Sequence, residues 1–198
     1  MIKKNNHGIF IVVSGPSGVG KGTVCQKLIK KLNAWYSISA TTREIRDGEQ
    51  DGVNYYFLTK EEFEKKISEG NFLEYALYNG NYYGTPKEKI LEKINSGVDV
   101  FSEIEVQGAK NIKKMFPDAL LIYILPPSME ELRRRLEGRG TNSKDDIDNR
   151  IAIAYKEFEE INNYDYIVAN NDIDETVEVI KEIIASEKHS AKRVELDF

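Results

Sequence analysis

The sequence predicts an α/β fold in which a parallel sheet is flanked by helices, with an inserted subdomain and a small lid. Two observations carry this prediction: apolar strands alternate with amphipathic helices at both ends of the chain, and a tyrosine-rich polar stretch separates the two ends. The 198 residues suit one domain with a sizeable core, since 40% of them are hydrophobic. We expect a core of residues 8–37, 91–138 and 151–186, an insertion at about 38–90 and a lid at about 139–150.

The core opens with a strand and a helix. Residues 8–13 form an apolar run of the kind that is buried on both faces of a parallel sheet. A helix is expected over about 20–32, because Val24 and Leu28 lie on one stripe. The glycine-rich segment between them therefore leaves a buried strand and enters a helix.

The middle of the chain does not continue this alternation. Residues 42–83 are rich in tyrosine and polar side chains, and a capping-box pattern within them predicts a helix from Thr59 to about Gly70. A second helix is expected with Pro86 as its first helical residue, a position that proline favours. An apolar run at 98–104 then returns to the sheet, so the middle is interpreted as an insertion between two core strands.

The second half of the chain repeats strand and helix. Residues 120–125 predict another buried strand, which a proline pair ends, and a capping-box pattern predicts a helix over about 128–138. A strand at 165–169 and an amphipathic helix at about 172–186 complete the core. The polar, charged stretch at 139–150 interrupts this order.

Composition excludes several classes of function. A formal net charge of -5 without an overall basic stripe argues against a general nucleic-acid binder. The single cysteine, Cys25, excludes an internal disulfide and a cysteine-built zinc site. The N-terminus is polar and no apolar run reaches transmembrane length, so we expect a cytoplasmic protein with no membrane partner and no signal peptide.

The segment "SGPSGVGKGT" matches the phosphate-binding loop pattern of glycine, four residues, then glycine and lysine. Glycines let backbone N–H groups converge at a helix N-terminus, where the helix dipole favours an anion, and the lysine reaches the β- and γ-phosphates. The alternative is a glycine turn that only packs a helix on a strand. The flanking strand and helix favour a P-loop NTPase-type fold with a nucleoside triphosphate site at Gly15, Pro16, Ser17, Gly18, Val19, Gly20, Lys21, Gly22 and Thr23.

The position after Lys21 departs from the usual pattern. Gly22 stands where a serine or threonine normally holds Mg²⁺, and Thr23 follows one residue later. We expect Mg²⁺ as the cofactor that accompanies ATP. Thr23 is the candidate ligand, and water completing the metal shell is the alternative.

The phosphate-binding loop and several motifs after it resemble those of guanylate kinases, which are nucleoside monophosphate kinases. The resemblance extends from residue 8 to about 184 and implies transfer of the γ-phosphoryl group of ATP to GMP, giving ADP and GDP, in purine nucleotide salvage or recycling. It implies ATP and GMP as partners and keeps dGMP open as an acceptor. The motifs occur in the order "GPSGVGKGT", "SISATTREIRDGEQDGVNYYF", "GNFLEYALYNGNYYGTP", "EIEVQGA", "LEGRGTNS" and "IVANND".

Two arginines and two tyrosines in the insertion suit a phosphate group. Arg43 and Arg46 lie three residues apart, and guanidinium forks bind a phosphate dianion well. Tyr55 and Tyr83 add phenolic donors, whereas a solvated turn with ordinary surface charges is the alternative. The resemblance implies that these residues bind the phosphate of GMP and that Arg43 also acts in catalysis.

Guanine presents N1–H and N2–H₂ as adjacent donors, which one carboxylate accepts together and adenine cannot match. The resemblance assigns this role to Glu74 in "FLEY" and assigns hydroxyl contacts to Ser39 and Thr85. For Thr85, the N-cap of the following helix is an alternative or additional role.

Two carboxylates lie near the end of the strand expected at 98–104. Glu103 and Glu105 occupy positions i and i+2, so they point to one side at the sheet edge where ligands bind. The resemblance places them near the metal and the guanine, and we include them in the GMP site. Ser102 is polar where an apolar residue is expected.

Arginines in and before the polar stretch at 139–150 resemble those of the family's lid. The resemblance implies that Arg139 and Arg150 are catalytic and close over the transferred phosphoryl group, with Arg135 and Asn170 on the ATP side. A solvated charged face is the alternative. The acceptor oxygen is already anionic, so alignment and charge neutralisation are expected to suffice without a general base.

Two other functions remain open at this stage. One is a related enzyme that phosphorylates AMP, a pyrimidine nucleotide or a phosphorylated sugar, and the predicted guanine site argues against it. The other is a non-catalytic, peptide-binding guanylate-kinase-like module, and the intact loop and lid argue against that. The oligomeric state is left open.

Overall fold

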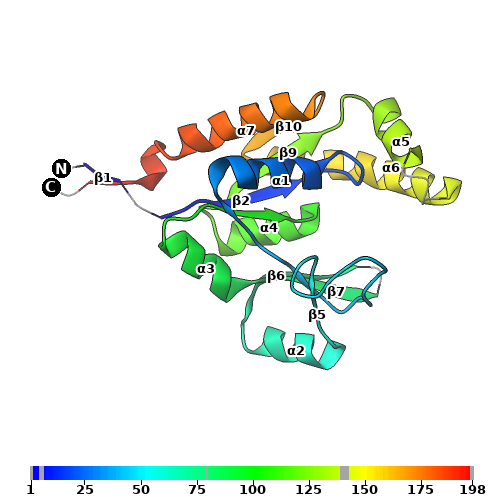
Figure 1. Cartoon of the computed structure of the whole chain (residues 1–198), viewed down its shortest axis with the longest axis horizontal. Helices are drawn as coiled ribbons and strands as arrows, with labels where there is room; N and C mark the ends of the chain where they lie inside the picture. The colour runs from blue at the N-terminus through cyan, green and yellow to red at the C-terminus, as the bar shows by residue number, and fades with distance from the viewer. Residues whose placement is uncertain (1, 5–6, 79, 139–142, 197–198) are drawn as a thin grey trace.

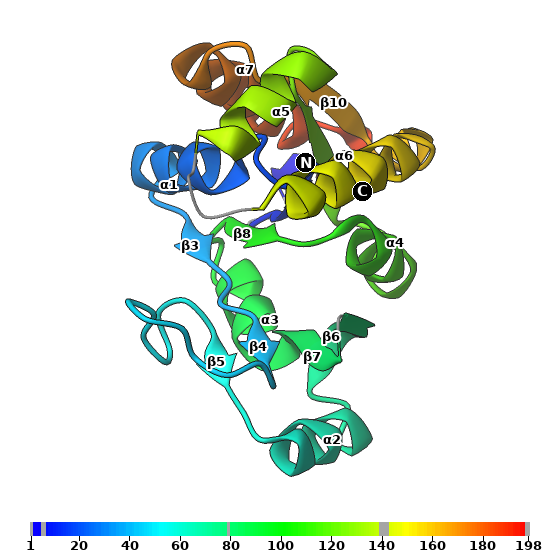
Figure 2. The same ribbon diagram turned by 90° about the vertical axis from the view of Figure 1, so that its right-hand side faces the viewer.

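The computed structural model of the chain describes residues 2–4, 7–78, 80–138 and 143–196. Its core is a parallel sheet with strand order β10-β9-β2-β8-β3, which confirms the predicted fold class (Figures 1 and 2). The strands are β2 (Phe10–Ser14), β3 (Trp35–Tyr36), β8 (Val100–Glu103), β9 (Leu120–Leu125) and β10 (Tyr166–Ala169).

The central strand β2 contributes side chains to two apolar clusters, one on each face of the sheet. Ile11 and Val13 belong to one cluster, and Phe10 and Val12 belong to the other, which explains why the run is apolar at every position. Buried residues of the first cluster come from α1 (Lys21–Leu32), α5 (Met129–Glu137), α6 (Lys144–Phe158) and α7 (Ile173–Glu187). Those of the second come from α3 (Lys87–Asn95) and α4 (Val106–Met115).

A second sheet, with strand order β5-β4-β7-β6, lies below the core in Figure 2. Its helix α2 (Lys60–Ser68) packs through Phe63, whose ring stacks on Phe72 and Tyr82 with centroids 4.5 Å and 5.2 Å apart. Gly84 permits this contact, because a Cβ there would lie 2.8 Å from the Phe63 ring. The strands are β4 (Ala40–Thr41), β5 (Tyr56–Phe57), β6 (Phe72–Tyr78) and β7 (Asn81–Pro86).

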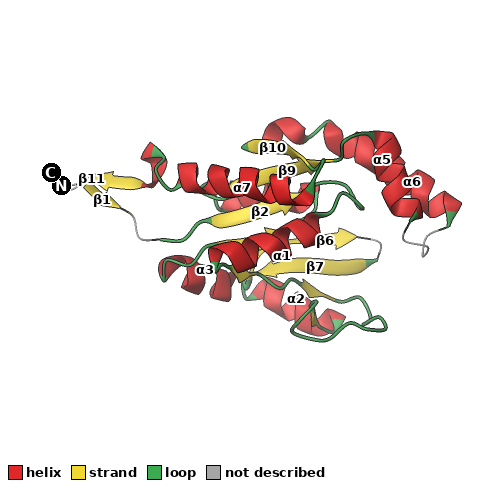
Figure 3. Ribbon diagram, turned by 45° about the horizontal axis from the view of Figure 1, so that its top comes forward, coloured by secondary structure: helices red, strands yellow, loops and turns green. Residues whose placement is uncertain are grey.

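The two ends of the chain pair with each other. β1 (Ile2–Lys4) and β11 (Val194–Leu196) form an antiparallel ribbon, which the sequence analysis did not predict. Figure 3 shows this ribbon at the end of the molecule remote from α5 and α6. Two short 3₁₀ helices, Ile161–Asn163 and Ala191–Arg193, complete the secondary structure of the described residues.

The start of α3 differs from the prediction. Pro86 is the N-cap of the helix and the last residue of β7, with ψ near 130° and Phe72 as its strand partner. Strand pairing therefore continues one residue further than the sequence suggested, and the helix begins at Lys87.

Helix α6 was not predicted at all. A capping box formed by Ser143 and Asp146 starts it, and it continues to Phe158, so the predicted boundary between lid and core at residue 150 falls inside one helix. Its first turns carry three acidic or basic residues in a row, which conceals the buried stripe of Ile147, Ile151 and Ala154. Among the described residues, no helix is both long and apolar enough to cross a bilayer.

Candidate active site

The glycine-rich loop connects β2 to α1. Gly20 is the N-cap of α1 with φ near 102°, and Gly15 has φ near 146°. A Cβ at Gly15 would lie 2.4 Å from the carbonyl oxygen of Ile124, so only glycine fits against β9 at this point. The loop thus ends at a helix N-terminus, where unpaired N–H groups favour an anion.

Lys21 folds back over this loop. Its Nζ donates to the carbonyl oxygens of Gly15 at 2.6 Å and Pro16 at 3.2 Å. Burial lowers the pKa of Lys21, while the nearby carboxylates of Glu103, Glu157 and Glu105 act in the opposite direction. A lysine held by two carbonyls in this way can turn to a phosphate group without moving its backbone.

Two residues predicted to bind ATP brace the loop from behind. Asn170 is buried, and its Nδ2 donates to the carbonyl oxygen of Val19 at 2.7 Å. Arg135 donates to the carbonyl oxygens of Val19 at 3.3 Å and Asn170 at 3.2 Å, while Glu131 accepts from its Nε at 2.8 Å. Both side chains therefore fix the loop, and their contact with ATP itself stays a prediction.

Helix α6 brings Arg150 to the loop from the other side. Its NH1 donates to the hydroxyl of Ser17 at 2.5 Å. Arg133 of α5 pairs with Asp148 of α6 at 2.6 Å, which ties the two helices together. Arg139 lies outside the described residues.

A cavity of about 190 Å³ opens between the second sheet and the core. Its lining contains every residue predicted for the GMP site except the two arginines. The lining residues are Ser39, Tyr55, Glu74, Ala76, Tyr83, Gly84, Thr85, Glu103, Ile104, Glu105, Gln107 and Gly108.

Glu74 and Thr85 form a fixed pair in this cavity. The Thr85 hydroxyl donates to Glu74 Oε1 at 2.7 Å, and Thr85 is buried. The alternative role of Thr85 as a helix N-cap is wrong, because Pro86 occupies that position. Burial raises the pKa of Glu74 to about 6, against the effect of the Thr85 hydrogen bond. The sequence analysis missed Gly108, where a Cβ would lie 3.0 Å from Glu74 Oε2.

Glu103 connects the cavity to the loop. The Tyr36 hydroxyl donates to Glu103 Oε1 at 3.2 Å. A Cβ on Gly22 would lie 3.6 Å from the same oxygen, so a carboxylate faces the space that a serine or threonine hydroxyl would fill. Burial raises the pKa of both Glu103 and Glu105, and Lys21 counteracts it. Tyr36 was also missed, since its role depends on a contact across the sheet.

Arg43 is oriented by a carboxylate that the sequence analysis did not single out. Its NH2 donates to both oxygens of Glu49, at 2.8 Å and 3.0 Å, and its guanidinium lies 5.5 Å from the centroid of the Tyr55 ring. The Arg43 side chain is only 13% exposed because it pairs with Glu49, and its binding to the GMP phosphate stays a prediction, as does the surface-charge alternative. Arg46 is exposed, and its backbone N–H donates to Glu49 Oε2 at 2.9 Å.

Ser102 is buried on β8, and its hydroxyl has no hydrogen-bond partner among the described residues. Nothing in the structure explains the polar residue at this position.

Comparisons with known proteins agree with one another. The family model for guanylate kinase matches residues 8–187 of this chain. The guanylate kinase of Clostridioides difficile (strain 630) is 50% identical over 187 residues, which are 94% of this chain and 91% of that protein. That of Clostridium tetani (strain Massachusetts / E88) is 49% identical, with 94% and 90% covered. The crystal structure of guanylate kinase from Anaplasma phagocytophilum matches with a TM-score of 0.80 and 35% identity, covering 96% of this chain and 92% of that one.

Proposed function

Because the chain belongs to the guanylate kinase family, we propose that it moves the γ-phosphoryl group of ATP to GMP by alignment and charge neutralisation, without a general base. Family membership makes ATP-dependent phosphorylation of GMP its activity. One observation carries the finer proposal: a single cavity gathers a fixed carboxylate and two hydroxyl-bearing residues for guanine, and it adjoins the phosphate-binding loop.

The donor is proposed to bind at the loop between β2 and α1. Lys21 exchanges its contacts with the carbonyls of Gly15 and Pro16 for the phosphate oxygens of ATP. The backbone N–H groups around Gly20 face the same anion at the start of α1. Arg135 and Asn170 support the loop and complete the predicted ATP site.

Mg²⁺ is proposed to accompany ATP, and the residues at the site fit it. Carboxylate oxygens are the ligands that Mg²⁺ prefers, and Glu103 faces the space beside Gly22. Glu103 and Glu105 would hold the ion directly or through its waters, and the exposed Thr23 hydroxyl, the ligand expected from the sequence, stays a candidate beside them. The bound ion supplies positive charge to the phosphate oxygens.

The acceptor is proposed to lie in the cavity with its base against Glu74. In its ionised form this carboxylate accepts from N1–H and N2–H₂ of guanine, and Thr85 holds it in place. Ser39 supplies a further hydroxyl contact. The phosphate of GMP is proposed to bind to Arg43, Arg46, Tyr55 and Tyr83, where Arg43 already lies beside the Tyr55 ring.

The lid is proposed to supply the last positive charges. Arg150 lies on the loop at Ser17, which is where the phosphates of ATP would bind, and Arg139 is proposed to join it. Their closure excludes water, which would otherwise hydrolyse ATP. Purine nucleotide salvage or recycling in the cytoplasm is the proposed setting, with dGMP kept open as a second acceptor.

Coupled release of ADP from ATP and Mg²⁺ tests the acceptor. We expect turnover with GMP and kcat/KM lower by at least about 10²-fold with AMP or UMP, because their bases do not offer Glu74 the two adjacent donors of guanine. Comparable turnover with AMP or UMP would contradict the guanine site. No ADP release with any acceptor would favour the non-catalytic, peptide-binding module.

A further inference from the structure

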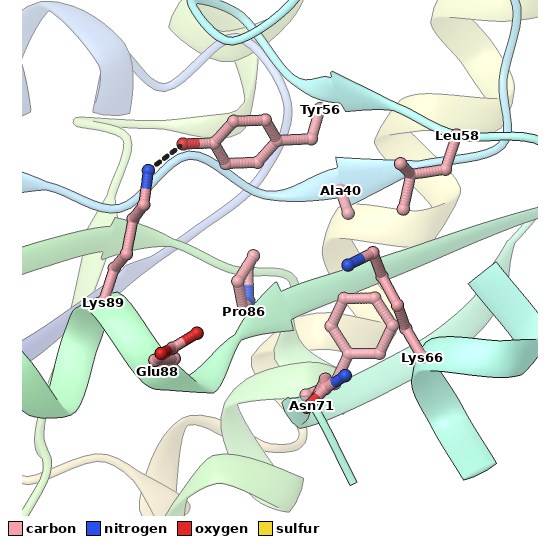
Figure 4. Close-up of a pocket in the computed structure, with 9 residues that line it drawn as sticks. Ala40, Tyr56, Leu58, Lys66, Asn71, Pro86, Glu88 and Lys89 are labelled. Atoms are coloured by element: carbon pink, nitrogen blue, oxygen red, sulfur yellow. Dashed lines mark hydrogen bonds between the residues drawn. The ribbon is translucent and has the colours of Figure 1, made fainter. Parts of the chain in front are cut away.

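A second cavity, of about 310 Å³, lies on the opposite face of the sheet that carries the GMP site. Figure 4 shows it between strands of this sheet and the helices α2 and α3. Neighbouring residues on the strands divide between the two cavities, since successive side chains point to opposite faces. The pairs are Ser39 and Ala40, Tyr55 and Tyr56, and Thr85 and Pro86.

The floor of this reverse-face cavity is apolar. Ala40, Leu58, Phe72 and Pro86 line it, and Ala40 is buried while the other three are partly buried. Its volume lies at the lower limit of ordinary ligand pockets, so it fits a small molecule. The Tyr56 ring adds a flat aromatic wall.

Two ammonium groups flank this floor. In Figure 4, Lys89 of α3 lies on one side and Lys66 of α2 on the other. Lys89 Nζ donates to the Tyr56 hydroxyl at 3.3 Å, and neither lysine pairs with a carboxylate among the residues that the structure describes. Glu88 also lines the cavity. With Lys66, Lys89 and Glu88 all ionised, the charged side chains that line the cavity carry a net charge of one positive unit.

We propose that this cavity is a second binding site, for a small organic anion with a flat apolar body. The apolar floor and the Tyr56 ring hold the body, and the anionic group lies between the ammonium groups of Lys66 and Lys89. A purely apolar ligand would leave both lysines unused. The site is distinct from the GMP cavity, and its existence does not depend on the proposed phosphoryl transfer.

The probe is naphthalene-1-sulfonate, titrated into ¹⁵N-labelled protein that is saturated with GMP to fill the other cavity. We expect the amide signals of Leu58, Lys66 and Asn71 to shift in a saturable manner. Lys66→Glu should raise the Kd of the probe by about tenfold or more, because it replaces an attraction for the sulfonate by a repulsion. Lys65→Glu is the matched control, since Lys65 is 75% exposed on the same helix, does not line the cavity and changes the net charge equally.

Leu58→Trp, which fills the floor, should abolish the shifts while GMP binding persists. The proposal is overturned if GMP prevents the probe from binding, because the probe was then in the GMP cavity. It is equally overturned if Lys65→Glu and Lys66→Glu raise the Kd of the probe to the same extent. The same holds if naphthalene, which lacks the sulfonate, binds as tightly as the probe.

Discussion

At the scale of single residues, the site depends on carboxylates whose charge the protein controls by burial. Glu74 is held by the Thr85 hydroxyl in a cavity where burial raises its pKa to about 6. Glu103 faces Lys21 and Gly22 at the other end of the same cavity. Small residues give these carboxylates room, as Gly108 does for Glu74. If Glu74 binds guanine as proposed, specificity for the acceptor has a titratable component.

The first prediction concerns the pH dependence of GMP binding. A raised pKa means that Glu74 is protonated below about pH 6 and then no longer accepts both guanine donors. We expect kcat/KM for GMP to fall as pH decreases through about 6 and to be level above it. The measurement is a pH profile of kcat/KM at saturating ATP.

Two variants decide whether Glu74 causes this fall. Thr85→Val removes the hydrogen bond that lowers the Glu74 pKa, so the fall should move to higher pH. Glu74→Gln should lower kcat/KM for GMP by about 10²–10⁴-fold and remove the fall, because two hydrogen bonds are lost or mispaired. An unchanged profile in Glu74→Gln would rule out Glu74 as the titrating group.

The second prediction concerns the donor site. Lys21→Ala removes the ammonium group that lies over the loop, so kcat should fall by about 10²–10³-fold or more. The melting temperature should change little, because the removed hydrogen bonds are offset by relief from burying a charge. A folded variant with near-normal turnover would mean that the loop does not bind ATP.

At the scale of elements, helix α6 connects Arg150, one of the two predicted lid arginines, to the loop. α6 starts at a capping box, packs on the core through Ile147 and Ile151, and holds Arg150 on the Ser17 hydroxyl. Arg43 lies instead in the loop between β4 and β5 of the insertion, where Glu49 orients it. The two arginines thus belong to different parts of the molecule and are expected to act at different steps.

The third prediction separates them by steady-state kinetics. Arg43→Ala should raise KM for GMP strongly, because Arg43 is proposed to bind the acceptor phosphate throughout the reaction. Arg150→Ala should lower kcat by around 10²–10⁵-fold with less effect on GMP affinity, as expected for an arginine that acts mainly near the transition state.

A surface arginine provides the control. Arg134 is 74% exposed and, among the residues that the structure describes, pairs with Glu131 of its own helix, so Arg134→Ala should leave kcat and the KM for GMP unchanged. GMP affinity without ATP is measured by calorimetry. If Arg150→Ala weakened GMP binding as much as Arg43→Ala and kept kcat, the lid assignment would be wrong.

At the scale of the whole molecule, the site is shared between two sheets. Glu74 and Thr85 come from the inserted sheet, whereas Glu103 ends core strand β8 and Lys21 begins α1. Their cavity is lined from both sides, so a ligand that fills it contacts both parts. We therefore expect the proposed transfer between two bound nucleotides to bring these parts closer together.

The fourth prediction is that the two nucleotides together compact the molecule. With GMP and a non-hydrolysable ATP analogue, the radius of gyration should fall by on the order of 1 Å from the roughly 16 Å expected for this length. Small-angle X-ray scattering measures it, with each nucleotide alone as the control. An unchanged radius with both bound would show that the parts are already closed.

Local signals in the sequence were sufficient for much of the fold. The apolar run of β2 and the glycine loop before α1 are determined by neighbouring residues, because burial pattern and backbone freedom act over a few positions. The capping-box patterns at Thr59 and Ser128 predicted α2 and α5 for the same reason, and both side chains accept from the backbone N–H three residues later. Helix α6 was missed because its charged face hides a narrow buried stripe.

The candidate site also contains some features that the sequence predicts and others that only the structure shows. The sequence by itself determined that a phosphate loop ends in Lys21, and motif resemblance identified Glu74 and the two arginine sets. Only the tertiary structure decided that Tyr36 holds Glu103 and that Asn170 and Arg135 brace the loop. These contacts join positions on different strands, helices and loops, and their partners are set by how the elements pack, which no local pattern specifies.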